Sequence, residues 1–322
     1  MNVRRRHISA TVIAAATALT LGSLSACSSD SSAADSSGKL DVVASFYPLQ
    51  FLAEEIGGSH VSVSTLTEPG QEPHDLEISA KQTAQLQESD VALYLKDLQP
   101  SVDEAIGQSE VRTKIDAATL TDLEKHGNEV GGHAAEHDDE HGHEDEEGSG
   151  LDPHIWLDPV KYAEVAEGVG KAFEKADPDN AATYKKNTAA LVKKLDGLDT
   201  RFEDGLKDTR TKVFITTHAA FGYLAERYGL TEEAINGLDP ESEPSANRVK
   251  DLEKMAKADG VSTVFYETLV SDKTAKTIAA DANLKTDVLD PIEGITKKSR
   301  GDDYIQVMDA NLKALQTALG AK

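Results

Sequence analysis

Residues 177–202 read DPDNAATYKKNTAALVKKLDGLDTRF, and their pattern decides the fold. Side chains that can form one apolar face recur at alternating spacings of four and three, at Tyr184, Thr188, Leu191, Leu195, Leu198 and Phe202. Such spacing predicts an amphipathic helix. Asp177 followed by Pro178 is typical of a helix start. A helix of about 28 residues is about 40 Å long, so we expect one long connecting helix over 177–207.

Short strand-like runs alternate with helical stripes on both sides of this helix. The runs are Leu40 to Ser45, Val61 to Leu66, Val91 to Leu95, Val213 to Thr217, Val261 to Tyr266 and Thr286 to Leu289. Strands that alternate with helices predict parallel sheets. The sequence therefore predicts an α/β fold in which two parallel-sheet lobes, residues 39–176 and 208–322, are joined by one long rigid connecting helix. A further helix is expected to start at Asp158-Pro159, by the same capping logic.

The N-terminus has the pattern of an export signal. Three arginines at positions 4–6 precede an apolar stretch from Ile8 to Leu24, which is short for a membrane span and typical of a signal peptide. The stretch ends in Leu24-Ser25-Ala26-Cys27, which resembles a bacterial lipobox. We therefore expect residues 1–27 to be a signal peptide with Cys27 as the lipid attachment site, and residues 28–38 to be a flexible tether.

Composition narrows the classes of partner. The formal net charge is −24, and removal of the three arginines with the signal peptide moves it to −27. Nucleic acid is excluded as a partner, because its binding depends on clustered Lys and Arg. Cys27 is the single cysteine, so no disulfide is expected. The remaining chain exceeds one hydrophobic core of ordinary size, which favours two lobes.

The ten histidines divide by position. His7 lies in the signal peptide, and several others lie in or beside the segment 127–150, which is predicted to be a long disordered loop. Between Gly131 and Gly150 this loop holds eight carboxylates, no Lys or Arg, and His133, His137, His141 and His143. It either binds metal weakly at several places, as an auxiliary site, or is a solvated spacer.

Four residues of the folded halves stand at the ends of predicted elements. His218 and Asp290 each follow a predicted strand, at the edge where open α/β sheets place their ligands. His74 follows a turn-rich stretch after the second strand, and His154 lies between two prolines before a capped helix. Each residue taken singly is either a ligand or a polar residue satisfied at an element end. Two candidates come from each half, which predicts a site in the interlobe cleft.

Motifs that carry catalysis are missing from the sequence. It contains no Gly-x-Ser-x-Gly elbow, no phosphate-binding Gly-Lys-Ser/Thr loop, no Gly-x-Gly-x-x-Gly turn and no His-Glu-x-x-His. These absences weigh against an enzyme. A zinc hydrolase with three histidines and an activated water stays open as an alternative from another class.

At these residues the chain resembles the metal-binding receptors of bacterial ABC importers, the ZnuA- and TroA-like solute-binding proteins. The resemblance covers nearly all of residues 39–322, and DPHIWLDP at 152–159 is its most specific segment. The other segments are ASFYPL at 44–49, PHD at 73–75, THAAFGY at 217–223, EPS at 243–245 and LDP at 289–291.

The resemblance implies a zinc site made by His74, His154, His218 and Asp290. Three imidazoles and one carboxylate suit tetrahedral Zn²⁺, whereas manganese-type members have a carboxylate in place of His218. Some zinc members complete the site with water or a nearby glutamate instead, which makes Glu72 a substitute for Asp290. We also expect Glu267 to orient one imidazole, Trp156 and Phe221 to pack behind the histidines, and His60 to lie at the surface.

The function implied is capture of Zn²⁺ outside the cytoplasmic membrane and delivery to an ABC permease with its ATPase. The protein is expected to be a monomer, anchored to the cell membrane through its N-terminal lipid, and not an enzyme. A manganese or iron receptor of the same family is the nearest alternative. An adhesin is a third alternative, and no feature of the sequence supports it.

Overall fold

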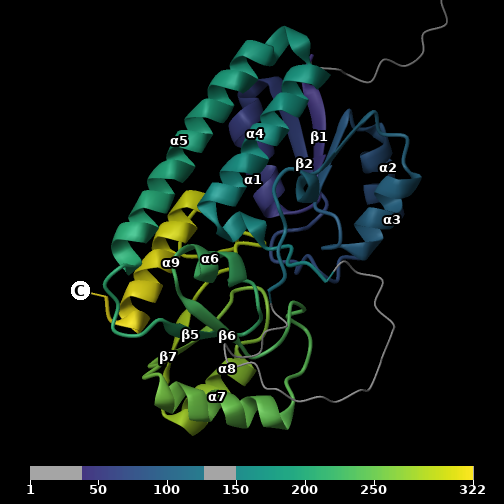
Figure 1. Cartoon of the computed structure of the whole chain (residues 1–322). Coiled ribbons are helices and arrows are strands. Elements are labelled where there is room, and N and C mark those ends of the chain that lie inside the picture. The colour runs from purple at the N-terminus through teal and green to yellow at the C-terminus, as the bar shows by residue number, and fades with distance from the viewer. Residues whose placement is uncertain (1–37, 127–149, 322) are drawn as a thin grey trace, which may run out of the picture. The chain divides into compact units, whose positions relative to one another are not determined.

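Two four-stranded parallel sheets form the framework of the chain (Figure 1). The computed structural model describes residues 38–126 and 150–321. The first sheet has the order β2-β1-β3-β4 and contains β1 (Leu40–Ala44), β2 (Val61–Thr65), β3 (Val91–Tyr94) and β4 (Thr113–Asp116). The second has the order β6-β5-β7-β8 and contains β5 (Val213–Thr216), β6 (Thr231–Ala234), β7 (Thr263–Tyr266) and β8 (Lys285–Val288). The predicted α/β class with two parallel sheets is confirmed.

All six predicted strands are present, and the structure adds two that the sequence pattern did not indicate. The added strands, β4 and β6, read TKID and TEEA and lie at an edge of their sheets. An edge strand is covered less completely than a central one, so it needs no run of β-branched apolar residues. Their polar composition explains why hydrophobic patterning missed them.

Nine helices pack around the two sheets in the part of the chain described. Those of the first half are α1 (Tyr47–Gly57), α2 (Ala80–Glu88), α3 (Pro100–Gln108) and α4 (Pro159–Ala176). The connecting helix is α5 (Ala181–Leu206). Those of the second half are α6 (Gly222–Arg227), α7 (Ala246–Ala258), α8 (Lys273–Ala282) and α9 (Tyr304–Leu319).

The connecting helix α5 has 26 residues, which makes it about 39 Å long. The predicted apolar stripe is its buried face, from Tyr184 to Leu206. It starts later than the Asp177-Pro178 pair suggests, because Pro178–Asn180 form a separate 3-10 turn. The Asp177 carboxylate accepts hydrogen bonds from the Tyr184 hydroxyl and the Asn180 amide, so it ties this turn to the helix instead of capping it.

The helix predicted from Asp158-Pro159 begins there. The Asp158 carboxylate accepts a hydrogen bond from the backbone N–H of Val160, at 2.9 Å, as expected for an N-cap residue. The same carboxylate accepts three hydrogen bonds from the guanidinium of Arg227, in α6. A helix start in the first half is thereby held to a helix of the second half.

Alternate residues of the central strands face different cores. In β1, Val42 and Ala44 belong to a large cluster, whereas Val43 belongs to a smaller one with residues of α2 and α3. In β5, Phe214 faces the large cluster and Ile215 a small one with residues of α7 and α8. Each sheet therefore has helices on both faces.

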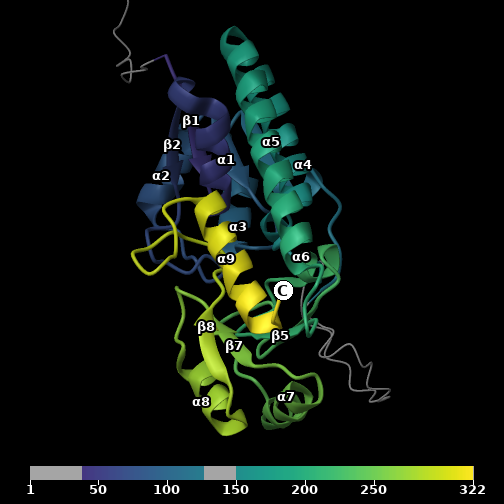
Figure 2. The same ribbon diagram turned by 90° about the vertical axis from the view of Figure 1, so that its left-hand side faces the viewer.

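The large cluster is shared by the two halves. It runs from Leu40 in β1 through the buried face of α5 to Leu319 in α9. Helix α5 packs along α1 and α4 and also against α9, which lies beside it in both ribbon views (Figure 2). The described residues accordingly belong to one compact unit.

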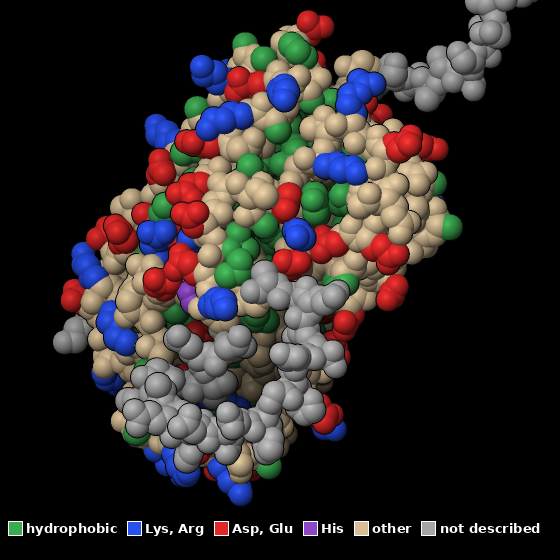
Figure 3. Space-filling view, turned by 45° about the vertical axis from the view of Figure 1, so that its right-hand side comes forward, with side chains coloured by type: hydrophobic (Ala, Val, Ile, Leu, Met, Phe, Trp, Pro, Cys, Tyr) green, Lys and Arg blue, Asp and Glu red, His purple; other side chains and the backbone are tan. Residues whose placement is uncertain are grey.

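The surface is polar and of mixed charge. Acidic and basic side chains are interspersed on the face drawn in Figure 3, and only a small area of histidine is visible there. None of the helices in the described ranges, 38–126 and 150–321, has the length and hydropathy required to cross a membrane.

Candidate metal site

Four side chains from both halves of the chain converge on one point. They are His74, His154, His218 and Glu293, and one potential ligand atom of each lies within 4.8 Å of the others. His74 lies in the loop after β2, His154 immediately before the 3-10 turn Ile155–Leu157, His218 just beyond β5, and Glu293 in the loop after β8. Three of the four thus follow the carboxyl ends of parallel strands, as expected for ligands of such sheets.

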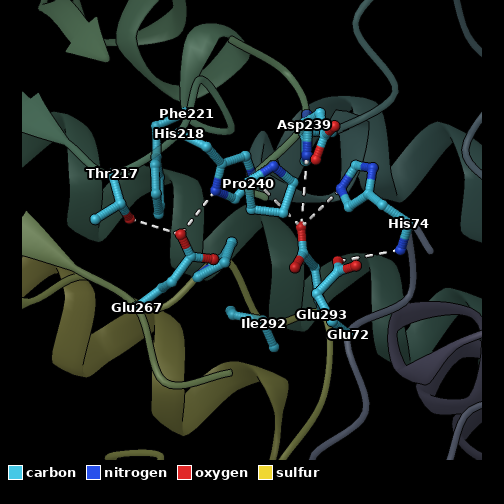
Figure 4. Close-up of polar contacts among 12 residues, drawn as sticks. Glu72, His74, Thr217, His218, Phe221, Asp239, Pro240, Glu267, Ile292 and Glu293 are labelled. Carbon is cyan, nitrogen blue, oxygen red and sulfur yellow. Dashed lines mark hydrogen bonds and ion pairs between the residues drawn. The ribbon is translucent and has the colours of Figure 1, made fainter. Parts of the chain in front are cut away.

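The spacing of these atoms suits a tetrahedral ion. Oε1 of Glu293 lies 3.3 Å from Nε2 of His74 and 3.5 Å from Nε2 of both His154 and His218 (Figure 4). A tetrahedron with metal–ligand bonds of about 2.0–2.1 Å has edges of about 3.3–3.4 Å. A zinc-sized ion between the four atoms would therefore require little movement of the side chains.

Two buried carboxylates fix the orientation of two of these imidazoles. Nδ1 of His154 donates to Asp152 at 2.7 Å, and Nδ1 of His218 donates to Glu267 at 2.9 Å. Glu267 is held in turn by the Thr217 hydroxyl, at 2.6 Å. A carboxylate can only accept these bonds, so the proton is on Nδ1 and Nε2 points at Glu293. The predicted contact of Glu267 with an imidazole is confirmed, and Asp152 plays the same part for His154.

The site contains buried polar atoms without a partner. Nε2 of His154, Nε2 of His218 and Oε2 of Glu293 have no hydrogen-bond partner among the described residues. The side chains of these three residues are at most 1% exposed, whereas that of His74 is 12% exposed. Unpaired buried polar atoms cost free energy, and a cation beside Oε1 of Glu293 would satisfy both imidazole nitrogens at once.

The pKa shifts of the residues in the cluster also indicate that positive charge is favoured at this point. Burial by itself lowers the pKa of His154, but the Asp152 carboxylate outweighs burial and raises that pKa above its ordinary value. Burial likewise opposes protonation of His218, yet Glu267 and Glu293 raise its pKa well above the usual range. Burial alone would raise the pKa of Glu293, but the three imidazoles around its carboxylate hold that pKa well below the usual range.

Asp290, the fourth ligand that the sequence predicts, does not join this cluster. Its Oδ1 accepts a hydrogen bond from the backbone N–H of Ile292 at 2.9 Å, and its Oδ2 accepts one from the Thr268 hydroxyl at 3.2 Å. The carboxylate therefore braces the turn that follows β8. Glu293, three residues further on, holds the position that the sequence assigned to Asp290.

Glu72, the substitute considered for Asp290, also has other partners. One of its carboxylate oxygens accepts from the backbone N–H of His74 at 3.0 Å, and the other accepts from that of Asp75 at 3.2 Å. Figure 4 draws it beside Glu293, with its bond directed to the backbone of His74. Glu72 thus shapes the loop that carries His74.

The aromatic residues expected behind the histidines are buried there. The Trp156 ring lies 5.1 Å from that of His154, and its Nε1 donates to the carbonyl of Pro291 at 2.7 Å. Phe221 is 2% exposed and is drawn beside His218 (Figure 4). Trp156 therefore links the segment that carries His154 to the turn that carries Glu293.

The remaining sequence-predicted sites cannot be compared with this geometry. Cys27, the predicted lipid attachment site, and the four loop histidines His133, His137, His141 and His143 lie outside the described residues. They stay predictions.

Comparison with known proteins identifies the family of the chain. The family model described as "Zinc-uptake complex component A periplasmic" matches residues 42–318. The chain is 36% identical to the zinc-binding lipoprotein AdcA of Streptococcus pneumoniae, over 91% of this chain and 58% of AdcA. It is 35% identical to the high-affinity zinc uptake system protein ZnuA of Bacillus subtilis, over 92% of each chain. The chain thus spans little more than half the length of the AdcA proteins but nearly all of the Bacillus ZnuA.

A solved structure shows the same fold with metal bound. The Zn(II)-bound ZnuA-like domain of Streptococcus pneumoniae AdcA has a TM-score of 0.72 and 33% identity, over 88% of this chain and 99% of that domain. Sequence and structure comparisons therefore agree with the family resemblance read from the motifs. The chain belongs to the ZnuA family of zinc-uptake proteins.

Proposed function

We propose that this protein is an extracytoplasmic solute-binding receptor that captures Zn²⁺ and delivers it to an ABC permease with its ATPase. One observation carries the proposal: three imidazoles and one carboxylate from both halves meet at a single buried point, with unpaired ligand atoms. Membership of the zinc-uptake family gives the partner class. The ion is cargo, and His74, His154, His218 and Glu293 hold it.

The donor set favours zinc over manganese. Three imidazole nitrogens and one oxygen suit a tetrahedral ion of intermediate softness, whereas manganese prefers carboxylates, carbonyls and water in octahedral sites. A manganese or iron receptor is the alternative within the family. We expect zinc to displace manganese from the purified metal-free protein at equal total concentrations, and excess manganese to leave bound zinc in place. Equilibrium dialysis followed by metal analysis measures both, and retention of manganese against equimolar zinc would refute the preference.

Capture without catalysis follows from the number of protein ligands. A catalytic zinc keeps three protein ligands and an open position for water. Here four protein side chains each offer one ligand atom to a single point. The zinc hydrolase alternative therefore has no place for its nucleophile.

Anchoring and organisation complete the proposal. Residues 1–27 act as an export signal, Cys27 carries the lipid at the cell membrane, and residues 28–38 tether a monomeric receptor formed by lobes 39–176 and 208–322. The AdcA relative is named a lipoprotein, in keeping with this assignment. Release on docking involves small shifts of one lobe and of the ligand loops, because α5 packs against helices of both halves and resists wide opening.

Zinc affinity should fall as the pH is lowered, and the fall should begin above the ordinary histidine pKa of about 6.5. The raised pKa values of His154 and His218 mean that their imidazoles keep protons to higher pH, and each proton must leave before the metal binds. Lower pH therefore favours the protonated, metal-free form. Isothermal titration calorimetry at pH 8.5, 7.5 and 5.5 measures the trend. Equal affinities at the three values would contradict a site made of imidazoles.

A further inference from the structure

A second group of potential ligands lies outside the site already described. Glu124, His126 and Glu226 each offer an atom, and these atoms lie within 4.8 Å of one another. Glu124 and His126 come from the segment that precedes the predicted histidine-rich loop, and Glu226 comes from α6. The three are among the residues that line an open cavity of about 700 Å³, which gives solvent ions access to them.

The segment that carries Glu124 and His126 is held in a fixed position. The backbone N–H of Glu124 donates to the Tyr223 hydroxyl at 2.8 Å, and that hydroxyl donates to the carbonyl of Asp152, also at 2.8 Å. The backbone N–H of Asp152 donates to the carbonyl of Glu124, again at 2.8 Å. The His126 ring also packs edge-on against Tyr223, with centroids 4.5 Å apart. The two side chains are therefore presented from a braced segment.

The orientation of the His126 imidazole is the independent observation that points to a ligand. Its Nδ1 lies 3.0 Å from Oδ2 of Asp152, whose side chain is fully buried. A carboxylate that accepts from one imidazole nitrogen leaves the other free for a metal, as is usual for ligating histidines. That other nitrogen, Nε2, lies 3.0 Å from Oε2 of Glu226, and Glu124 offers a further potential ligand atom within 4.8 Å of this group.

The carboxylates around His126 outnumber the lysine beside them, so the local charge favours a bound cation. Three carboxylates, from Glu124, Asp152 and Glu226, surround His126. Lys161 pairs with Oε1 of Glu124 at 2.8 Å. Burial by itself lowers the pKa of His126, but hydrogen bonds to Asp152 and Glu226 raise that pKa to about 9.

We propose that Glu124, His126 and Glu226 form a second site for a divalent transition-metal ion such as Zn²⁺, separate from the first. The ion binds to Nε2 of His126 and one oxygen of each glutamate, and water fills its remaining position. The site is weaker than the first, because its glutamates are 42% and 61% exposed and Lys161 competes for Glu124. It can be loaded and emptied while the first site stays filled.

Asp152 connects the two sites. Its Oδ2 accepts from His126 and its Oδ1 from His154, a ligand of the first site. This role rests on the proposed function, whereas the second site itself does not. Failure of the proposed function and failure of the second site can be told apart. If the first site does not bind zinc, the weaker ion should still be found at the second site.

Counting bound ions in the full chain tests the second site. The background variant carries His133→Gln, His137→Gln, His141→Gln and His143→Gln, which removes the loop imidazoles in every sample. Equilibrium dialysis against Zn²⁺ alone, at concentrations that saturate the weaker site, is followed by metal analysis. We expect Glu124→Gln together with Glu226→Gln to bind one equivalent fewer than the background and to keep the tightly held ion. Equal stoichiometry in the two proteins would overturn the proposal.

A matched pair controls for charge. Glu167 on α4 and Glu203 on α5 are exposed and belong to neither ligand group, so Glu167→Gln with Glu203→Gln makes the same charge change elsewhere. This control should retain the weaker ion, and its loss there would show a general charge effect and refute the site. The tight ion verifies folding of each variant. The single Glu226→Gln variant, altered at the more exposed glutamate, repeats the count if the double variant does not fold.

Crystals of the full chain soaked in Zn²⁺ give a direct answer. We expect an anomalous peak at the zinc edge about 2.0–2.2 Å from Nε2 of His126 and from an oxygen of Glu226. A map with a peak at the first site and none beside His126 would refute the second site.

Discussion

The Glu293→Gln variant should lose more zinc affinity than the roughly 10- to 100-fold that changes to outer partners of metal ligands cost. Oε1 of Glu293 lies 3.3–3.5 Å from the three imidazole nitrogens, and its carboxylate is the only one in the cluster. Glutamine keeps the volume and removes the charge. A dication buried among three neutral imidazoles would then have no carboxylate in direct contact, and only Asp152 and Glu267, behind the imidazoles, would offset its charge. Competition with a chromophoric zinc chelator at pH 7.5 measures the loss.

Asp290→Asn is the matched control for this prediction, because it removes a buried carboxylate from the same turn. Asn retains an oxygen that can accept from the backbone of Ile292, so the turn should persist. The loss of affinity should stay within the range given for outer partners. A larger loss for Asp290→Asn than for Glu293→Gln would restore Asp290 as the fourth ligand and contradict the geometry described above.

Replacement of His154 by Gln should abolish tight zinc binding altogether. This imidazole is fully buried, its Nδ1 is fixed by Asp152, and its Nε2 has no partner among the described residues. Among the described residues no further imidazole belongs to the cluster, and the buried side chains of His218 and Glu293 have little room to adjust. Zinc retained after dialysis against a chelator, measured by metal analysis, should fall from one equivalent to none.

His60→Gln provides the control for His154→Gln. His60 is partly exposed and ends the short 3-10 turn Gly58–His60, away from the ligand cluster. The same chemical change there should leave zinc retention unaltered. If the two variants retain zinc equally, the cluster is not the binding site.

The three imidazoles could be located from the sequence because each stands at the end of a recognisable element. His218 follows the apolar strand β5, and His154 precedes the capped helix α4. His74 follows β2 through a segment rich in turn residues. Parallel strands bring their carboxyl ends to one edge, so position in the pattern predicts proximity in space. That reasoning gave the histidines from the residues alone, and the family resemblance gave their role.

Glu293, the fourth member of the cluster, could not be located in this way, because its position depends on an unusual backbone conformation. Ile292 has φ 62°, a left-handed conformation that is rare for a β-branched residue. It reverses the chain after Pro291, so that Asp290 braces the turn and Glu293 points into the site. Propensity argues against such a conformation at isoleucine. The only signal in the sequence was a second carboxylate shortly after the strand, at Glu293.

The large apolar cluster common to both sheets has a consequence for attempts to dissect the protein. It joins β1 to α9 by way of the buried face of α5. A cut at either end of α5 would therefore leave each fragment with a large apolar surface exposed to solvent, which favours aggregation. Neither half is a self-sufficient folding module, and the chain between residues 38 and 321 is expected to fold and unfold as one body.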